Sequence, residues 1–337
     1  MKSFILQRFL LSVLTLWILS MISWVIIELP PGDFIDVYIL ELVGASGKAG
    51  SSQSMGLMNT EEMERVLRDQ YGLNKPIYVR YAKWVWRMFH GDLGNSLEFV
   101  KPVTEVVGER LLLTVILATT TAVLAWGLAI PIGIYTAVRQ NSPEDYVFTF
   151  IGFLGLAVPD FLLALWLLWV SFAYFGQSIG GLLDPEYLNA PWSWARVQNL
   201  ISHLWIAAFV VGTAGTAALI RVMRANLLDE LNRPYVITAR AKGLPEWKVI
   251  LKYPVRLALN PLVSTLGYLL PFLISGSIIV SVVLNLPTEG PLLLRALLVE
   301  DMFISASIVL VLGAMTVIGT FLSDVLLSLI DPRIRLR

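Results

Sequence analysis

Long apolar stretches dominate this sequence of 337 residues. Each is about 20 residues or longer, which is the length that a helix needs to cross the hydrocarbon core of a bilayer. Backbone groups facing lipid find no water to bond, so each stretch should be helical. The predicted spans are 9–29, 111–138, 147–175, 200–220, 257–286 and 303–327. The sequence therefore predicts an all-α integral membrane protein with six transmembrane helices.

The composition agrees with this interpretation. Hydrophobic residues make up 56% of the chain and charged residues 15%, whereas soluble domains carry about 25% charged residues. The first apolar run, from Phe9 to Leu29, is longer than the roughly 7–15 residues of a signal-peptide core. We therefore expect it to be an uncleaved first span.

Charge and reactive side chains exclude several kinds of function. Lys plus Arg and Asp plus Glu balance at 25 each, so the net charge favours no acidic partner such as a nucleic acid. There is no cysteine, which excludes disulfides and thiolate metal sites. His90 and His203 are the only histidines, and no Gly-x4-Gly-Lys-Ser/Thr loop is present to hold nucleotide phosphates. We expect no metal and no cofactor in this chain.

The positions of the basic residues predict the orientation. Basic residues of short loops collect on the cytoplasmic side of a membrane. The short segments near the N-terminus, after spans two and four, and at the C-terminus hold 14 of them, whereas the two short loops on the other side hold only Arg196 and Arg295. Both termini should therefore be cytoplasmic. These 14 residues are Lys2, Arg8, Arg139, Arg221, Arg224, Arg233, Arg240, Lys242, Lys248, Lys252, Arg256, Arg333, Arg335 and Arg337.

The predicted organisation has three parts. Residues 1–29 form the first helix, 30–110 an insertion on the outer side, and 111–337 the remaining core. Within the insertion, Asn59 and Glu62 resemble a capping box that opens a helix ended by Gly72. A second helix should run from Pro76 to Gly91, with one apolar face comprising Ile77, Tyr81, Trp84, Val85 and Met88, whereas 44–56 has the composition of a flexible loop. The insertion either caps helix ends or docks an external protein.

The loop 226–256 between spans four and five carries helical patterns. Gly243 supplies the left-handed backbone that ends one short helix, and Pro245 with Glu246 starts another, whose apolar face is Trp247, Ile250 and Leu251. Small residues at Ala239 and Ala241 would let another surface approach closely. The loop is either a docking site for a partner or an amphipathic helix lying on lipid.

Several polar or aromatic residues fall at membrane depth. Asp160 follows Pro159 in span three, where it either caps the second half of a broken helix or serves the translocated solute. Asp324 is expected to pair with Arg221 or Arg224. A second set consists of packing and pathway candidates. Gly212, Gly215, Thr216 and Ala218 should pack against another helix. Trp166, Trp169, Trp205 and Tyr268 are candidates for a pathway or for interfacial belts, and Ser275 is a candidate for the pathway.

One family resemblance accounts for many of these features. The segment YVITARAKGLPEWKVILKYPVRLALNPLVS (235–264) resembles the coupling loop of permease subunits in the dipeptide and oligopeptide ABC importer family. Within this coupling loop, only Ala239 and Gly243 strictly match the pattern that is general to binding-protein-dependent importers. Further segments of the chain stand in the order and places usual in the peptide importer family. These segments are LPPGD (29–33), YGLNKPIYVRYAKWVWRMFHGDLGNSL (71–97), IPIGIYTAVRQNS (130–142), LAVPDFLLAL (156–165) and LIDPRIRLR (329–337).

The resemblance implies a type I importer subunit in the inner membrane. Its partners would be a second homologous permease, two cytoplasmic ATPase subunits that bind ATP and Mg, and an extracytoplasmic solute-binding protein. The permease itself would not be an enzyme. The residues implied to contact the ATPase are Thr238, Ala239, Arg240, Lys242, Gly243, Leu244, Pro245 and Trp247. The candidates for the pathway, which come from their position at membrane depth and not from the resemblance, are Asp160, Trp166, Tyr268 and Ser275.

Other functions fit the sequence less well. A secondary transporter usually shows internal repeats with matching broken helices, and only span three carries a break. A membrane enzyme would need a catalytic cluster, and a receptor would need a larger cytoplasmic domain. The substrate is left open, because relatives of peptide importers carry oligosaccharides, opines or nickel.

Overall fold

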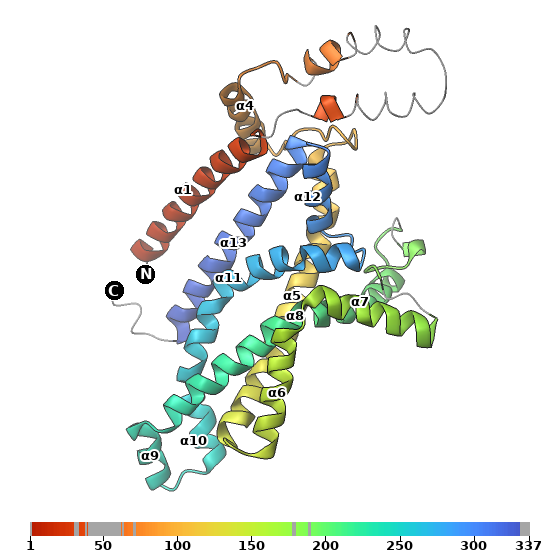
Figure 1. The fold of residues 1–337 in the computed structure, drawn as a ribbon. Coiled ribbons are helices and arrows are strands. Elements are labelled where there is room, and N and C mark those ends of the chain that lie inside the picture. Colours follow the sequence, from red (N-terminus) through yellow and green to blue (C-terminus); the bar gives the residue numbers. More distant parts are fainter. Residues whose placement is uncertain are drawn as a thin grey trace. The chain divides into compact units, whose positions relative to one another are not determined.

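The structure is a computed structural model that describes residues 2–29, 34–37, 39, 62, 64–69, 72–176, 180–187 and 190–330. The side chains of 2–6, 175, 266–277 and 326–330 lie outside this description. So do several predicted features: most of LPPGD, the loop 44–56, the capping residue Asn59 and the three C-terminal arginines. The described residues are almost entirely helical (Figure 1).

The described helices fall into a shorter and a longer set. The shorter helices are α4 (Ile77–Phe89), α6 (Pro143–Ala157), α7 (Asp160–Val170), α9 (Pro234–Ala241), α10 (Glu246–Lys252) and α12 (Glu289–Leu298). A π-helical turn, Ser171–Phe175, continues α7, and a 3-10 turn covers Pro185–Tyr187. The longer helices are α1 (Lys2–Ile27), α5 (Val103–Val138), α8 (Trp194–Leu231), α11 (Pro254–Val283) and α13 (Met302–Ile330).

Four described helices are long and apolar enough to cross a membrane: α1, α5, α8 and α13. The pair α6 and α7 makes a fifth span if its two bent halves count as one. The predicted span 257–286 lies in α11, where the side chains of 266–277 are outside the description, so it stays a prediction. The structure therefore confirms a helical membrane protein with four to five candidate spans.

The third predicted span is broken, as its proline indicates. The chain turns by 98° between α6 and α7. Val158 adopts an extended conformation with φ −85° and ψ 120° because Pro159 disfavours a helical residue before it. Pro159 also lacks the amide that would continue the α6 ladder. The break thus follows directly from the local sequence.

The chain divides into two compact units. The core unit comprises Met1–Ile5, Leu113–Gly290 and Met315–Arg337, and the flanking unit comprises Leu6–Leu112 and Pro291–Ala314. The core unit is held by an apolar cluster from α5, α7, α8, α10 and α11. In it, α8 packs along both α6 and α11.

The flanking unit has two apolar clusters of its own. One joins Trp24 of α1, Trp84 of α4 and Met302 of α13, and the other joins Val103 of α5 with Ile304 of α13. Within the first cluster, the predicted apolar face of α4 is confirmed for Tyr81, Trp84, Val85 and Met88, whereas Ile77 stays exposed. Gly72 (φ +69°) and Gly91 (φ +78°) have left-handed backbones where the two helices of the insertion were predicted to end.

A buried carboxylate fixes the N-terminus of α13. Asp301 is fully buried and accepts hydrogen bonds from the Ser96 hydroxyl (2.7 Å), the Leu97 amide (2.8 Å) and the Ile304 amide (3.3 Å). A side-chain acceptor at this position satisfies an amide that the first helical turn leaves free. Asp301 therefore ties the loop before α5 to the start of the last helix.

Candidate functional site

The short helices α9 and α10 form a hairpin at the C-terminal end of α8 (Figure 1). Helix α9 starts with Pro234 at its first position, and the chain reverses at Gly243, whose φ is +71°. A residue with a Cβ atom adopts this backbone only at a cost, which glycine avoids. The two predicted helices and the turn between them at Gly243 are confirmed.

An ion pair joins the two helices across the turn. The Arg240 guanidinium donates to both carboxylate oxygens of Glu246, with Nη2 to Oε1 at 2.6 Å and Nε to Oε2 at 3.2 Å. Arg240 holds the pKa of Glu246 below its usual value. Both side chains are exposed, so the pair stabilises the hairpin only modestly.

The inner side of the hairpin is a small apolar core. Val236 and Val249 are fully buried, Ala239 is almost so, and Tyr235 and Tyr253 pack against them. The expectation that the small side chain of Ala239 receives another surface is therefore wrong for that residue: Ala239 instead lets α9 and α10 pack together. The other residues predicted to contact the ATPase, apart from Ala239, are exposed: Thr238, Arg240, Lys242, Gly243, Leu244, Pro245 and Trp247.

The outer side of the hairpin exposes large apolar groups. Ile237, Trp247 and Leu251 are 59%, 62% and 53% exposed, and Leu244 lies beside them in the turn. The predicted apolar face of α10 is thus corrected: Val249 and Ile250 are buried, because α9 and the core unit cover that side. We name Ile237, Leu244, Trp247 and Leu251 the outer apolar patch.

The hairpin is joined to the long helices on both flanks. Ile250 belongs to the same apolar cluster as Met223 and Leu227 of α8 and Val255 of α11. Helix α8 runs unbroken to Leu231, so the first residues of the predicted loop 226–256 continue a span. After α10, Pro254 stands at the first turn of α11. The hairpin therefore packs directly against both α8 and α11.

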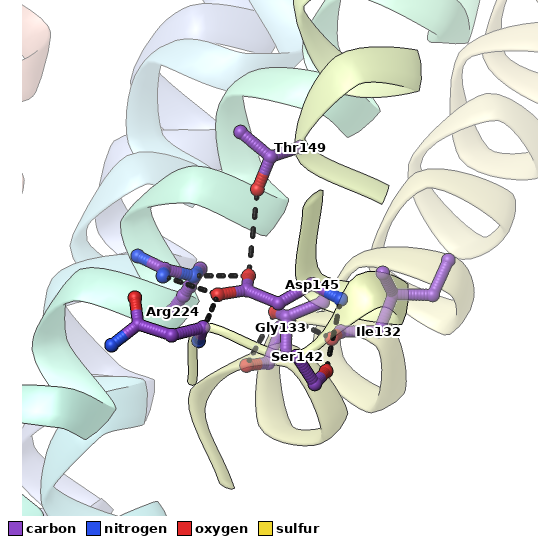
Figure 2. Close-up of polar contacts among 8 residues, drawn as sticks. Ile132, Gly133, Ser142, Asp145, Thr149 and Arg224 are labelled. Carbon is purple, nitrogen blue, oxygen red and sulfur yellow. Dashed lines mark hydrogen bonds and ion pairs between the residues drawn. The ribbon is translucent and has the colours of Figure 1, made fainter. Parts of the chain in front are cut away.

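A second contact fixes α8 near its C-terminal end, where Asp145 of α6 binds Arg224 in a bidentate geometry (Figure 2). Arg224 Nε lies 2.8 Å from Oδ1 and Nη2 lies 2.7 Å from Oδ2. Asp145 also accepts from the Asn141 amide at 3.0 Å, while its own amide donates to the Ser142 hydroxyl at 3.2 Å. Its side chain is 3% exposed.

This partner of Arg224 was missed by the sequence analysis, which considered Asp324. Asp145 lies in the first turn of α6, which follows the N-cap residue Ser142 and begins with Pro143. An acidic residue in this position stabilises the N-terminus of its own helix, so the local sequence explains Asp145 without a distant partner. Its partner is distant in the chain, and nothing local indicates it. The pair fixes α6 to α8 close to the hairpin.

Close helix packing supports the same region. A Cβ at Gly133 of α5 would lie 2.7 Å from the Met223 Cβ, and one at Gly212 of α8 would lie 3.1 Å from Thr121 Cγ2. The predicted small-residue face of α8 is confirmed at Gly212. At Gly215, by contrast, a Cβ would meet no described atom within 4 Å.

Asp160 lies at the break between α6 and α7 without the predicted cap. Helix α7 receives no side-chain capping hydrogen bond, and Asp160 Oδ1 is buried without a hydrogen-bond partner among the described residues. The capping role is therefore wrong. Of the other pathway candidates, Trp166 is 58% exposed on α7, and the side chains of Tyr268 and Ser275 lie outside the description.

A second unpartnered carboxyl group begins α12. Glu289 is fully buried, and neither of its carboxyl oxygens meets a hydrogen-bond donor among the described residues. Its amide donates to the Thr114 hydroxyl of α5 at 3.0 Å. Burial raises the pKa of Glu289 to about 7. The sequence analysis did not single out this residue, because a glutamate before Gly290 looks like an ordinary loop residue.

The described residues bring no three His, Cys, Asp or Glu side chains together as a metal site would. The candidate site is therefore an exposed hairpin with an apolar outer patch, which packs against two long helices. The ion pair of Asp145 with Arg224 fixes one of these helices nearby.

Comparison with known proteins agrees with this geometry. Residues 129–336 match the family described as binding-protein-dependent transport system inner membrane component. The chain is 34% identical over 340 residues to the oligopeptide transport system permease protein AppB of Bacillus subtilis, with 99% of each chain covered. It is 27% identical over 351 residues to the dipeptide transport system permease protein DppB of Escherichia coli, again with 99% of each covered. The chain belongs to the family of binding-protein-dependent inner membrane transport components and is a permease of this kind.

Proposed function

We propose that this chain forms one half of the membrane pathway of an ATP-driven importer for oligopeptides. The substrate class rests on the names of AppB and DppB, which match over nearly their whole length. A second homologous permease would supply the other half, and an extracytoplasmic binding protein would deliver the peptide. Six spans, with 30–110 outside and both termini in the cytoplasm, follow from the distribution of apolar and basic residues.

The observation that carries the proposal is the hairpin of α9 and α10. Its outer apolar patch is exposed although Trp247 and Leu251 are large hydrophobic residues. Lys242 and Lys248, which flank it, are exposed cations. Such a surface suits the groove of a cytoplasmic ATPase, because buried aromatic anchors carry much of the energy at protein interfaces.

Nucleotide binding would act on the pathway through this contact. Closure of the two ATPase subunits would displace the hairpin, and α8 and α11 would follow because Ile250 packs into their common core. The binding protein would favour the outward-facing state only if it binds that state more tightly than the inward-facing one. Oligosaccharides, opines or nickel would use the same machinery with another binding protein.

Retention of the ATPase on the purified permease tests the docking role. The double variant Trp247→Ala/Leu251→Ala should weaken this association by roughly 30-fold or more, because loss of a central Trp anchor costs about 2 kcal/mol. Trp205→Ala is the matched control, since Trp205 is similarly exposed (59%) but lies on α8 within a candidate span. Unchanged ATPase retention by the double variant, at normal insertion, would contradict the proposal.

A further inference from the structure

Helix α4 is fixed beside the C-terminal end of α1 (Figure 1). The Tyr81 and Ser20 hydroxyls are hydrogen-bonded at 2.8 Å, and the Trp24 and Trp84 rings lie 5.1 Å apart. Arg80 forms an ion pair with Glu28, directly after the last residue of α1. These contacts hold one face of α4 against a helix that is long and apolar enough to span a membrane.

The same contacts give the depth of α4 relative to the bilayer. Ser20 precedes the end of α1 by about two turns, which is roughly 10 Å along a helix. Val25 and Ile26, near that end, are 50% and 60% exposed, so we expect hydrocarbon to reach α1 at their level. Helix α4 therefore lies at the boundary between hydrocarbon and headgroups.

One exposed face of α4 is aromatic. Tyr78, Trp86 and Phe89 are 71%, 69% and 76% exposed, and their spacing places them on one side of a helix. Trp and Tyr concentrate at membrane interfaces, where the ring meets the apolar region and the polar tip meets water. An aromatic face at this depth favours a lipid neighbour over an aqueous one.

Beside this face is a cleft of about 690 Å³ that is rich in cations. Lys75, Arg80, Lys83 and Arg87 line it, and Asp69, which accepts from Asn74 at 2.6 Å, is the carboxylate among its lining residues. Arg80 and Arg87 have their own acidic partners, Glu28 and Asp92. Lys75 and Lys83 instead approach each other, and no carboxylate of the described residues pairs with them.

Two neighbouring ammonium groups repel each other, and the proximity of Lys75 lowers the pKa of Lys83. An anion placed between them would remove this repulsion. At the depth of α4 the abundant anion is the phosphate of a membrane lipid. Its acyl chains would extend along the exposed apolar side of α1, past Val25 and Ile26.

We propose that the cleft bounded by Lys75, Lys83 and Trp86 binds the headgroup of an anionic phospholipid, in the leaflet at the C-terminal end of α1. The site lies within the flanking unit and uses none of the residues assigned to ATPase coupling. It depends on the membrane placement of α1 alone and does not depend on the transported substrate.

The test is native mass spectrometry of the full-length permease titrated with phosphatidylglycerol in detergent. The variant Lys75→Gln/Lys83→Gln should bind the tightest phosphatidylglycerol roughly 30-fold more weakly than wild type, because each cation near an anionic lipid surface contributes about 1 kcal/mol. Lys75→Arg/Lys83→Arg, which keeps both charges, should bind like wild type.

The matched control is Lys101→Gln/Arg295→Gln. It removes the same charge from the flanking unit, but at two cations already paired with Glu105 and Glu98, and it should leave lipid binding unchanged. Equal binding of phosphatidylcholine and phosphatidylglycerol by wild type would overturn the proposal. So would an unaltered lipid titration for the glutamine variant together with weakened capture of the solute-binding protein, which would assign the cleft to protein docking.

Discussion

Asp145 satisfies several donors with one carboxylate: the Arg224 fork, the Asn141 amide and, more weakly, the Thr149 hydroxyl at 3.5 Å. Asn141 itself has a positive φ of 62°, a conformation that asparagine tolerates better than most residues. The turn at Asn141, the start of α6 and the ion pair with Arg224 therefore depend on one another. Figure 2 shows the Asp145 carboxylate between Arg224 and Thr149.

Removing one partner of this pair should be costly. Asp145→Asn leaves the partly buried guanidinium of Arg224 without a counter-charge, and such a change costs about 3 kcal/mol at most. We expect a clear fall in the thermal unfolding temperature of the detergent-solubilised permease. Arg139→Gln is the control, because its pair with Glu144 is exposed and longer, at 3.4 Å, and should contribute less than about 1 kcal/mol. Equal effects of the two substitutions would show that the buried pair has no special role.

Glu289 predicts a pH dependence of stability. Its pKa is raised from the usual 4.5 to about 7 by burial, so between these values the folded protein binds a proton that the unfolded chain does not. Stability from this residue must therefore fall as pH rises from about 4.5 to about 7 and stay low above that. Unfolding temperatures measured across this range should show that Glu289→Gln loses the decline. Parallel curves for the variant and wild type would refute the assignment.

Among the elements, the hairpin of α9 and α10 depends most on a single backbone conformation. A Cβ at Gly243 would meet no described atom within 4 Å, so only its positive φ of 71° opposes substitution. The cost of substituting Gly243 therefore reflects the backbone conformation of the turn and not a loss of packing.

A graded loss of coupling should follow from substitutions at Gly243. Gly243→Ala should cost the hairpin about 1–2 kcal/mol and reduce peptide uptake in part. Gly243→Pro fixes φ near −65°, so the turn cannot form, and both uptake and transport-coupled ATPase activity should be abolished while insertion persists. Gly215→Ala, at an open position of α8, should be silent. Full uptake by the proline variant would remove the hairpin from the coupling mechanism.

The elements that sequence alone predicted are those with local signals. Pro159 broke the third span, Gly91 ended α4, and Gly243 separated two short helices, because each signal acts within one or two turns. The pattern of apolar residues did not predict which side chains are buried where distant parts of the chain cover them. It could not tell that α10 buries Val249 and exposes Trp247, since α9 and the core unit determine which side is covered. The pairing of Asp145 with Arg224 was missed for the same reason.

For the molecule as a whole, the proposed ATPase contact on the hairpin would be coupled to two long helices. The core unit contains the hairpin, α8 and α11 in one apolar cluster, and protein interiors packed in this way transmit displacement instead of absorbing it. The absence of cysteine from the chain lets single cysteines be introduced without background labelling.

The most direct measurement is the accessibility of two such cysteines to a membrane-impermeant maleimide. Lys248→Cys places one at an exposed position of α10, and His90→Cys places the other at the exposed residue that directly follows α4 in the insertion. We expect His90→Cys to be labelled in intact spheroplasts. Lys248→Cys should be labelled only in inside-out vesicles and should be protected when the ATPase is bound. Two results would contradict the claim that a cytoplasmic ATPase binds and displaces this hairpin. One is labelling of Lys248→Cys from the outside, and the other is labelling of Lys248→Cys that does not change when the ATPase is bound.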